Sequence, residues 1–287
     1  MTNGQTPAFT PAEVRHYYDR NTRSFLEYGH GAATGSIHRA VLAPGVSTRE
    51  EAFRYVEDQI AAVASERLPA SLLTHVVDLG CGVGASLCYL ASRLPVAAAT
   101  GVTLSGVQAA LARERVERAG LAARVACLEG DFTALPAAIG RADLAFAIES
   151  FVHGSDPRAF LDEAARLVRP GGVLIVCDDF LTRGATAAAR PVLEQFRRGW
   201  HVNTLIDAEA LRDLAAAAGF DHLWTRDLTP WLELGRPRDR VFRAIAPLLR
   251  RLPRVPPRLA NVSGGAALQT ALARGWIRYE FAVFERR

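Results

Sequence analysis

The sequence contains no lysine, because arginine fills all 34 of its Lys and Arg positions. Enzymes that form a Schiff base with their substrate use a lysine amine, and nucleotide-binding proteins with a P-loop use a lysine to reach the phosphates. Both classes are therefore excluded for this chain.

Cysteine is scarce as well. The four cysteines all lie in apolar stretches, at Cys81, Cys88, Cys127 and Cys177. They form no CxxC pair and show no Cys/His spacing, which argues against a zinc site and against a disulfide framework and favours a reducing cytoplasm. We see no metal-ligand spacing elsewhere, although the neighbouring Asp178 and Asp179 could form part of a metal site.

Long apolar runs are also absent. No run approaches the roughly 18 apolar residues that a membrane span requires. The first residues, MTNGQTPAFTPAEVRHYY, have neither the basic nor the apolar region of a signal peptide. The sequence thus predicts a soluble, unexported protein with no membrane partner. Its 287 residues, 49% of them hydrophobic and 22% charged, fit two globular domains or one α/β domain with an appendage.

The positive charge of the chain is local. Eight arginines lie between Arg236 and Arg258 beside a single acid, so this segment carries +7 while the whole chain carries +4. It could be a solvated helix face, or it could meet an anionic acceptor or an acidic carrier protein. Nucleic acid is a poorer partner, because Phe242 is the segment's only aromatic residue and stacking on bases requires several.

From Leu72 onward, apolar runs of strand length alternate with segments of helical period, which is the pattern of βαβ units. The runs are almost continuously apolar, as in a parallel sheet that is buried on both faces. We expect strands at 74–79, 96–102, 124–128, 143–148, 173–177, 220–228 and 277–285. We expect helices near 84–94, 105–119, 157–168 and 207–218.

The chain is expected to divide into three regions. These are a helical cap over 1–70, a ligand-binding core over 71–180, and a C-terminal part over 181–287 that completes the core and adds cap insertions at about 181–206 and 230–275. Within the first region a Gly-rich stretch, 29–36, interrupts the helices. The last helix there should begin at Ser47 or Thr48, the residues that favour a helix N-terminus.

A glycine turn after the first predicted strand carries the strongest signal. In VVDLGCGVG, residues 76–84, an acid ends the strand, and glycines let a ligand approach the backbone at a helix N-terminus. Gly80, Gly82 and Ala85 also satisfy the dinucleotide pattern GxGxx(G/A). A nicotinamide enzyme, however, uses an acid about 20 residues further on to bind the ribose, and Thr103 stands near that place. The alternatives are a purely structural turn and a nicotinamide site.

Five motifs occur in order: VVDLGCGVG, GVTLSGVQ, EGDF, AIESFVH and LVRPGGVLIV. In this combination the chain resembles the class I S-adenosylmethionine-dependent methyltransferases, above all the small-molecule branch of tocopherol, sterol, sugar and natural-product methyltransferases. The resemblance covers residues 72–180 well. It implies a Rossmann-like α/β fold, with a seven-stranded, mostly parallel sheet whose last strand is antiparallel, under a helical cap.

The resemblance implies roles for residues near the methionine part of the cofactor. Gly80 and Gly82 would lie under it, and Asp78 would position its amino group directly or through the turn. Tyr18 would face the methionine carboxylate, although packing is an equally good role for it. Glu149 would line the junction between cofactor and acceptor.

The resemblance also implies residues for the nucleoside. Thr103 stands where many class I enzymes carry an acid on the ribose, and Gln108 would reach the ribose or the methionine end. Leu104 would pack on the adenine. Asp131 would accept a hydrogen bond from the adenine amine, with Phe132 beside the ring. Asp131 could instead be only a turn residue.

The acceptor side begins with His153. It follows the fourth predicted strand at its carboxyl end, where open α/β sheets bind their ligands, and imidazole titrates near neutral pH. We expect it to be a general base, the alternative being a polar loop residue. Asp178 and Asp179 could orient it, bind an acceptor hydroxyl or only solvate a strand end. Further acceptor contacts are expected from Ser150, Trp200 and His201, of which the last two could instead pack the cap.

The expected reaction is methyl transfer from S-adenosylmethionine to a hydroxyl oxygen of a small secondary metabolite. Positioning of donor and acceptor, with a base for the hydroxyl proton, would supply the catalysis. N- or C-methylation remains an alternative, as does a cyclase or rearrangement enzyme that keeps the cofactor as a structural group. The acceptor could be anionic or bound to a carrier, and the enzyme could be a cytoplasmic homodimer.

Overall fold

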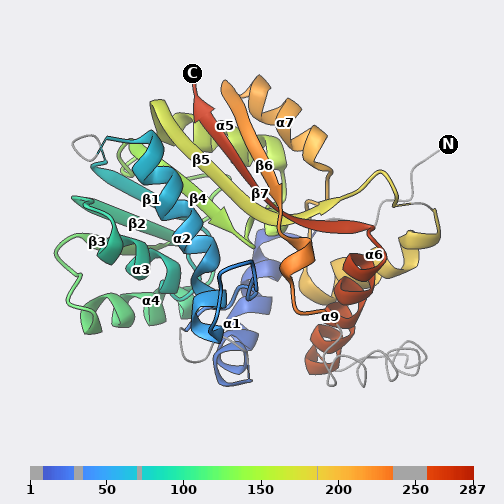
Figure 1. Ribbon diagram of the computed structural model, residues 1–287. Coiled ribbons are helices and arrows are strands. Elements are labelled where there is room, and N and C mark those ends of the chain that lie inside the picture. The colour runs from blue at the N-terminus through green and yellow to red at the C-terminus, as the bar shows by residue number, and fades with distance from the viewer. Residues whose placement is uncertain (1–8, 29–34, 70–72, 186, 235–256) are drawn as a thin grey trace.

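One sheet of seven strands forms the centre of the chain, in the order β3-β2-β1-β4-β5-β7-β6 (Figure 1). The computed structural model describes residues 9–28, 35–69, 73–185, 187–234 and 257–287. The strands are β1 (His75–Leu79), β2 (Ala98–Thr103), β3 (Val125–Glu129), β4 (Ala142–Ile148), β5 (Val168–Leu181), β6 (Phe220–Asp227) and β7 (Ile277–Arg286). Every predicted strand is present, so the predicted fold is confirmed.

Only β7 runs against the others. It lies between β5 and β6 and pairs with both in antiparallel register, whereas β1 to β5 pair in parallel. Buried positions in β4 are continuous from Ala142 to Ile148. This is the pattern expected when helices cover both faces of a parallel sheet.

The fifth strand is longer than predicted. The apolar run predicted 173–177, but β5 continues to Leu181 because β7 pairs with it through Asp178↔Glu280 and Asp179↔Tyr279. The two aspartates therefore lie inside the strand and not after it. Both are buried, which an apolar pattern cannot indicate for carboxylates.

Helices cover the two faces of the sheet, as Figure 1 shows. On one face lie α2 (Arg49–Arg67), α3 (Ala85–Arg93) and α4 (Gly106–Arg118), and on the other α5 (Pro157–Leu167) and α7 (Ala208–Ala217). The position of α2 differs from the expected cap. Val56 and Ile60 of this helix are fully buried in one cluster with Ile175 of β5, so α2 belongs to the core.

Side-chain caps set the starts of several helices. Thr48 accepts a hydrogen bond from the backbone of Glu51, whose side chain accepts one in return, which is a capping box. Ser105 caps α4 and Asp207 caps α7 in the same sense. Such caps fix where a helix begins, and here they place the turn before α4 at the end of β2.

Three helices form the cap beside the carboxyl ends of the strands: α1 (Pro11–Tyr28), α6 (Arg190–Trp200) and α9 (Pro257–Ala273) (Figure 1). Short 3-10 turns lie at Phe151–His153, Ala187–Ala189 and Thr229–Trp231. The segment between Arg236 and Arg258 lies outside the residues whose side chains are described. None of the helices in the described ranges is both long and apolar enough to cross a bilayer.

Candidate functional site

A cavity of about 580 Å³ opens where β1, β2, β4 and β5 end, between the sheet and the cap helices. It is lined by residues of the glycine turn, the turn after β2, the segment after β4, and helices α1, α6 and α9. This is the place where an open α/β sheet is expected to hold its ligand.

The glycine turn forms one wall of the cavity, and two of its glycines have different structural roles. Gly80 has φ +118°, and a Cβ there would lie 2.2 Å from the Cβ of Ser150. Gly82 has φ +51°, and among the described residues beyond its chain neighbours the only atom within 4 Å of an added Cβ is Cδ1 of Ile37, at 3.9 Å. Gly80 is therefore required by the protein's own packing, whereas Gly82 leaves space that faces the cavity. Ser150 lines the same wall, and its hydroxyl donates to the carbonyl of Leu79 over 2.6 Å.

Asp78 lies at the bottom of this wall. Its side chain is buried, and among the described residues it forms no salt bridge with a cation. Burial raises the pKa of Asp78 well above its usual value. A ligand that brings a positively charged group to this carboxylate would supply the missing partner.

The turn between β2 and α4 forms the next wall. The Thr103 hydroxyl donates to Oε1 of Gln108 over 2.7 Å, and both side chains are buried. Arg15 of α1 donates from Nε to the carbonyl of Leu104 over 3.1 Å, and Ser105 donates to Asp19 of the same helix. These contacts fasten α1 across the cavity.

Asp131 and Phe132 follow β3 at the same edge and line the cavity. Oδ1 of Asp131 accepts hydrogen bonds from the backbone and the hydroxyl of Thr133, so the turn role that we left open is present. The other oxygen has no hydrogen bond to a described residue, which leaves it available to a ligand. The Phe132 ring meets Phe160 edge-on at 5.3 Å between centroids.

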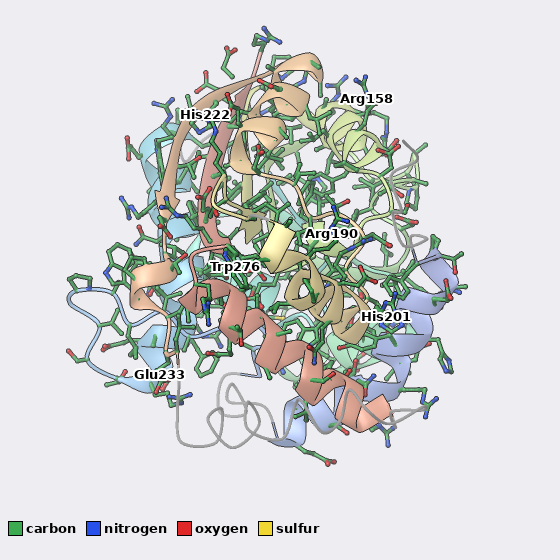
Figure 2. All side chains as sticks on the ribbon, turned by 90° about the vertical axis from the view of Figure 1, so that its right-hand side faces the viewer. Arg158, Arg190, His201, His222, Glu233 and Trp276 are labelled. Carbon is green, nitrogen blue, oxygen red and sulfur yellow. The ribbon has the colours of Figure 1, made fainter. Side chains whose placement is uncertain are left out.

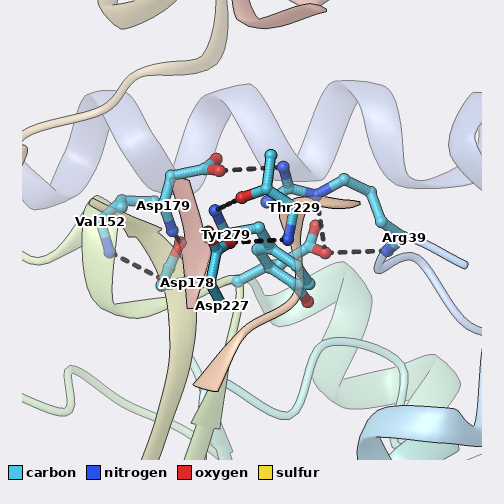
Figure 3. A network of polar contacts seen from close by, with 8 residues as sticks. Arg39, Val152, Asp178, Asp179, Asp227, Thr229 and Tyr279 are labelled. Atoms are coloured by element: carbon cyan, nitrogen blue, oxygen red, sulfur yellow. Dashed lines mark hydrogen bonds and ion pairs between the residues drawn. The ribbon is translucent and has the colours of Figure 1, made fainter. Parts of the chain in front are cut away.

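Arg39 links the N-terminal region to the ends of β4 and β5 (Figure 3). Its backbone N–H and Nε both donate to Oε1 of Glu149, over 2.8 and 3.0 Å, and NH1 donates to Asp179 over 2.9 Å. The guanidinium also lies 4.0 Å from the centre of the Tyr279 ring. Burial acts to raise the pKa of Glu149, but the charges of Arg39 and His38 outweigh it and lower that pKa. Arg39 lies in none of the five sequence motifs, so the sequence does not indicate this role.

Asp178 pairs with no cation in the part of the chain that the structure describes. It accepts hydrogen bonds from the backbone N–H groups of Val152 and Asp179, over 3.2 and 2.8 Å (Figure 3). Burial and the neighbouring Asp179 raise the pKa of Asp178 well above its usual value. Neither aspartate hydrogen-bonds His153, so other groups orient that imidazole.

His153 is held between two partners. Its Nδ1 lies 3.2 Å from the carbonyl oxygen of His201, and its Nε2 lies 2.6 Å from the hydroxyl of Tyr18. Because a carbonyl only accepts, Nδ1 carries the proton, and Nε2 accepts from the Tyr18 hydroxyl. Burial lowers the pKa of His153 to about 4, so the imidazole is neutral at physiological pH.

The end of α6 supplies the two remaining candidates. Trp200 lines the cavity and donates from Nε1 to the carbonyl of Asn261 over 3.1 Å. His201 is not among the described residues that line the cavity. Its ring packs between Phe9 and Tyr17, with centroids 4.4 and 4.5 Å away, where α6 meets α1 (Figure 2). His201 therefore acts on the site through its backbone carbonyl.

A buried charge cluster forms part of the cavity wall, to which His38 and Ser86 belong. His38 lies 3.0 Å from Oε1 of Glu57 through Nε2, and 3.2 Å from the carbonyl of Arg39 through Nδ1. Arg54 and Ser86 also donate to this carboxylate. Burial alone would lower the pKa of His38, but the charge and the hydrogen bond of Glu57 raise it to about 9. The imidazolium fixes the chain next to Arg39.

This cluster predicts a pH dependence of stability. A pKa raised from 6.5 to about 9 stabilises the fold fully below pH 6.5, and that contribution, on the order of 3 kcal/mol, is lost as pH rises through 9. Urea unfolding at about pH 6 and about pH 10 measures it. Glutamine does not titrate between pH 6 and 10. The loss of unfolding free energy between these two pH values should therefore be smaller in the His38→Gln variant than in the wild type, by on the order of 3 kcal/mol. An equal change in both proteins would show that His38 is not charged in the fold.

Known proteins resemble this chain along most of its length. A family described as "Methyltransferase domain" matches residues 77–176. The O-methyltransferase cnsE of Penicillium expansum is 30% identical over 233 residues, which cover 81% of this chain and 80% of that protein. The O-methyltransferase rstn1 of Aspergillus nomiae is 33% identical over 211 residues, or 74% of this chain and 90% of that protein.

A solved structure extends the likeness to the whole fold. The crystal structure of the cyclase SpnF superposes with a TM-score of 0.74 at 24% identity, and the match covers 99% of each chain. At this identity the match shows a shared fold. Together with the identity to the two relatives over most of both lengths, the matches show that this chain belongs to the class I S-adenosylmethionine-dependent methyltransferases.

Proposed function

We propose that this enzyme transfers a methyl group from S-adenosylmethionine to a hydroxyl oxygen of a small secondary metabolite, with His153 as the general base. The observation that carries the proposal is the neutral, half-buried imidazole of His153, which lines the cavity and whose Nε2 accepts a hydrogen bond from the hydroxyl group of Tyr18 over 2.6 Å. A hydroxyl acceptor would make the same kind of contact. The names of the two O-methylating relatives support oxygen as the acceptor atom.

The residues around the glycine turn fit the cofactor. Gly82 leaves room that a side chain would fill. The Asp78 carboxylate, which forms no salt bridge with a described residue, would meet the cofactor's amino group. Thr103 and Gln108 offer hydrogen-bonding groups on the next wall. The Asp131 oxygen that has no hydrogen bond to a described residue would accept one from the adenine amine. When bound, S-adenosylmethionine supplies a methyl group on a sulfonium that an oxygen nucleophile can attack.

The proton of the acceptor has a defined destination. Nε2 of His153 carries a lone pair, because the proton of the neutral imidazole is on Nδ1, which donates a hydrogen bond to the His201 carbonyl. The Tyr18 hydroxyl can accept a hydrogen bond while it donates one, so the leaving proton reaches Nε2 directly or through Tyr18. Burial raises the pKa of Tyr18 well above its usual value, so the phenol stays protonated at rest. The methyl group thus replaces a proton that ends on His153.

Incubation with methyl-labelled S-adenosylmethionine and a metabolite extract of the source organism tests the proposal. We expect label in an extractable small molecule and a methyl ether in the purified product. Label in protein or nucleic acid would contradict the substrate class, and a labelled amine or carbon would contradict the acceptor atom. Cofactor binding without any transfer would favour the alternative of a cyclase or rearrangement enzyme.

The low pKa of His153 predicts the pH dependence of kcat. With a pKa of about 4, most of the imidazole is neutral at pH 5, so kcat should be nearly constant between about pH 5 and 8. For an imidazole with the ordinary pKa near 6.5, the neutral fraction at pH 5 would be roughly 30-fold lower than at pH 8. Initial rates at saturating acceptor and cofactor measure the profile. Circular dichroism at each pH verifies that the enzyme stays folded, and a steep fall between pH 7 and 5 would contradict the proposed environment of the base.

A further inference from the structure

The turn that carries the proposed base is bonded to two neighbouring segments. This turn, Phe151–His153, follows β4 at the edge of the cavity. Its central N–H, that of Val152, donates to Asp178 of β5 over 3.2 Å. Its central carbonyl accepts from the backbone N–H groups of Asn203 and Thr204, over 2.8 and 2.9 Å. The backbone of the turn is therefore fixed between β5 and the segment that follows α6.

His201 begins that segment in a strained conformation. Its φ is +53°, in the left-handed region that residues other than glycine rarely adopt, and α6 ends there. In this conformation its carbonyl accepts from Nδ1 of His153 over 3.2 Å. Such strain persists where neighbouring contacts hold the residue, and the His201 ring packs between Phe9 and Tyr17, just before and within α1. The group that fixes the proton on Nδ1 thus depends on the position of α1.

Asn203 connects the start of α1 to the same turn through one amide group. Its Oδ1 accepts from the N–H of Phe9 over 2.6 Å, while Nδ2 donates to the carbonyls of Phe9 and His153, each over 3.0 Å. Both amide hydrogens are used, and Phe9 is bonded through its donor and its acceptor. A single half-buried side chain therefore joins two segments that lie far apart in the sequence.

Helix α1 also holds the other ring nitrogen of His153. Tyr18 of this helix donates to Nε2 over 2.6 Å. Both nitrogens are thus bonded to groups whose place depends on α1, because Tyr18 belongs to the helix and His201 packs against it. Arg15 and Asp19 separately fasten α1 to the turn after β2. That attachment does not involve the amide.

We infer that Asn203 is a positioning residue, which ties the start of α1 to the turn that carries His153 and so aligns the imidazole with its two partners. Because both amide hydrogens are engaged in this link, Asn203 acts through His153. The inference rests on the proposed function, which makes His153 the base. Loss of the amide should free the imidazole to turn and to meet water, while the glycine turn and the attachment of α1 to the turn after β2 stay in place.

Nuclear magnetic resonance of isotope-labelled histidine tests the inference without any methyl transfer. The signals of His153 are identified by their absence in His153→Gln. In the wild type, burial holds the pKa of His153 at about 4, so roughly a tenth of the imidazole is protonated at pH 5, and the neutral ring carries its proton on Nδ1. In Asn203→Ala we expect a pKa above about 5 and a mixture of both neutral tautomers, because the ring gains water and loses its fixed partners.

The titratable groups around the imidazole are the same in this variant. Among the described residues they are Tyr18 of α1, His201 after α6, Glu149 after β4 and Asp178 of β5. A change in the pKa or the tautomer therefore reports the position of the ring. Unchanged His153 signals in Asn203→Ala would overturn the inference.

Asn261→Ala is the matched control. The amide of Asn261 also bonds to α1, at Asn21 over 2.9 Å, but it has no hydrogen bond to the turn among the described residues. Trp200 keeps its partner, which is the backbone carbonyl of Asn261. We expect the His153 signals of this variant to equal those of the wild type. The same change in both alanine variants would mean that any loosening of the cap moves the ring, and Asn203 would have no special role.

Asn203→Ser provides a milder form of the test if the alanine variant does not fold. Serine keeps a polar group at this position but has one donor, where the amide bonds to two carbonyls. We expect the pKa and the tautomer of His153 to change in the same direction as in Asn203→Ala. Wild-type signals in a folded serine variant would contradict the inference.

A comparison of single and double variants connects the position of the ring to the rate. With the acceptor that the labelling experiment identifies, Asn203→Ala should lower the single-turnover rate by about tenfold or more, with the Kd for S-adenosylhomocysteine within about twofold. In the His153→Gln background the same substitution should change the rate by less than about twofold, because no base remains to be positioned. An equal loss in both backgrounds would show that Asn203 acts independently of His153, against the inference.

The resonance and rate measurements separate the inference from the proposed function. If His153 changes its pKa and tautomer as expected while no small molecule receives label, Asn203 positions the imidazole and the proposed reaction is wrong. If label is transferred and the His153 signals stay unchanged in Asn203→Ala, the reaction stands and the inference is wrong.

Discussion

Replacement of His153 by alanine is expected to lower kcat by roughly 10²–10⁴-fold, while the Kd for S-adenosylmethionine changes by less than about twofold. Among the described residues, Nε2 of His153 is the only acceptor of a hydrogen bond from the Tyr18 hydroxyl, and both residues line the cavity. Loss of the imidazole removes the proposed base and leaves the glycine turn unchanged. Single-turnover rates and cofactor binding, measured on the same preparation, give the two values.

The alanine variant leaves the Tyr18 hydroxyl and the His201 carbonyl without their partner, which costs roughly 1–3 kcal/mol for a buried group. His153→Gln is therefore measured beside it, because an amide oxygen can accept from Tyr18 but does not take up a proton. A loss of kcat in both variants identifies the base. A parallel loss of cofactor affinity would show instead that His153 is structural.

Tyr18→Phe separates the two routes of the proton. If the proton passes through the phenol, the variant should lose as much kcat as His153→Ala. If the acceptor hydroxyl meets Nε2 directly, the loss should stay below about tenfold, since the phenyl ring retains the packing against His153 that the centroid distance of 5.2 Å shows. The cofactor affinity of this variant also tests the expected contact between Tyr18 and the methionine carboxylate.

The sequence predicted the sheet well because its strands are continuous apolar runs that only a two-sided core accommodates. The positions of the helices in the first 70 residues were harder to predict. Helical period shows that one face of 49–67 is apolar, but it does not show what covers that face. Val56 and Ile60 pack on the sheet, so this helix belongs to the core, whereas α1 crosses the cavity.

Side-chain contacts between distant segments were beyond sequence reasoning. Arg39 reaches Glu149 and Asp179 across 110 and 140 positions, and no spacing rule connects residues so far apart. Tyr18 and His153 were both candidates, yet nothing in the pattern indicated that they bond to each other. Charge was the one signal that could have pointed to Arg39. Glu149 and Asp179 were both expected near the cavity, and buried acids require a cation or a proton.

The glycine turn gives the second large expected effect, through a pair of substitutions with opposite results. Gly80→Ala should lower the stability of the fold by roughly 3 kcal/mol or more, and Tm by about 5–10 °C, because a positive φ is combined with a clash against a fixed neighbour. The clash is with Ser150, whose Cβ would lie 2.2 Å from the new methyl group. Ser150 is held in place because its hydroxyl donates a hydrogen bond to the carbonyl of Leu79. Thermal unfolding without ligand measures this effect.

Gly82→Ala should act on the ligand instead of the fold. Beyond its chain neighbours, the new methyl group meets no atom of a described residue closer than 3.9 Å. The φ of +51° lies in the left-handed region, which costs residues other than glycine only about 1–2 kcal/mol. The methyl group projects into the space that we assign to the methionine part of the cofactor. We therefore expect a small fall in Tm with a Kd for S-adenosylhomocysteine at least about tenfold weaker, by titration calorimetry. Because the two substitutions add the same atom two residues apart, unchanged affinity in Gly82→Ala would place the cofactor elsewhere in the cavity.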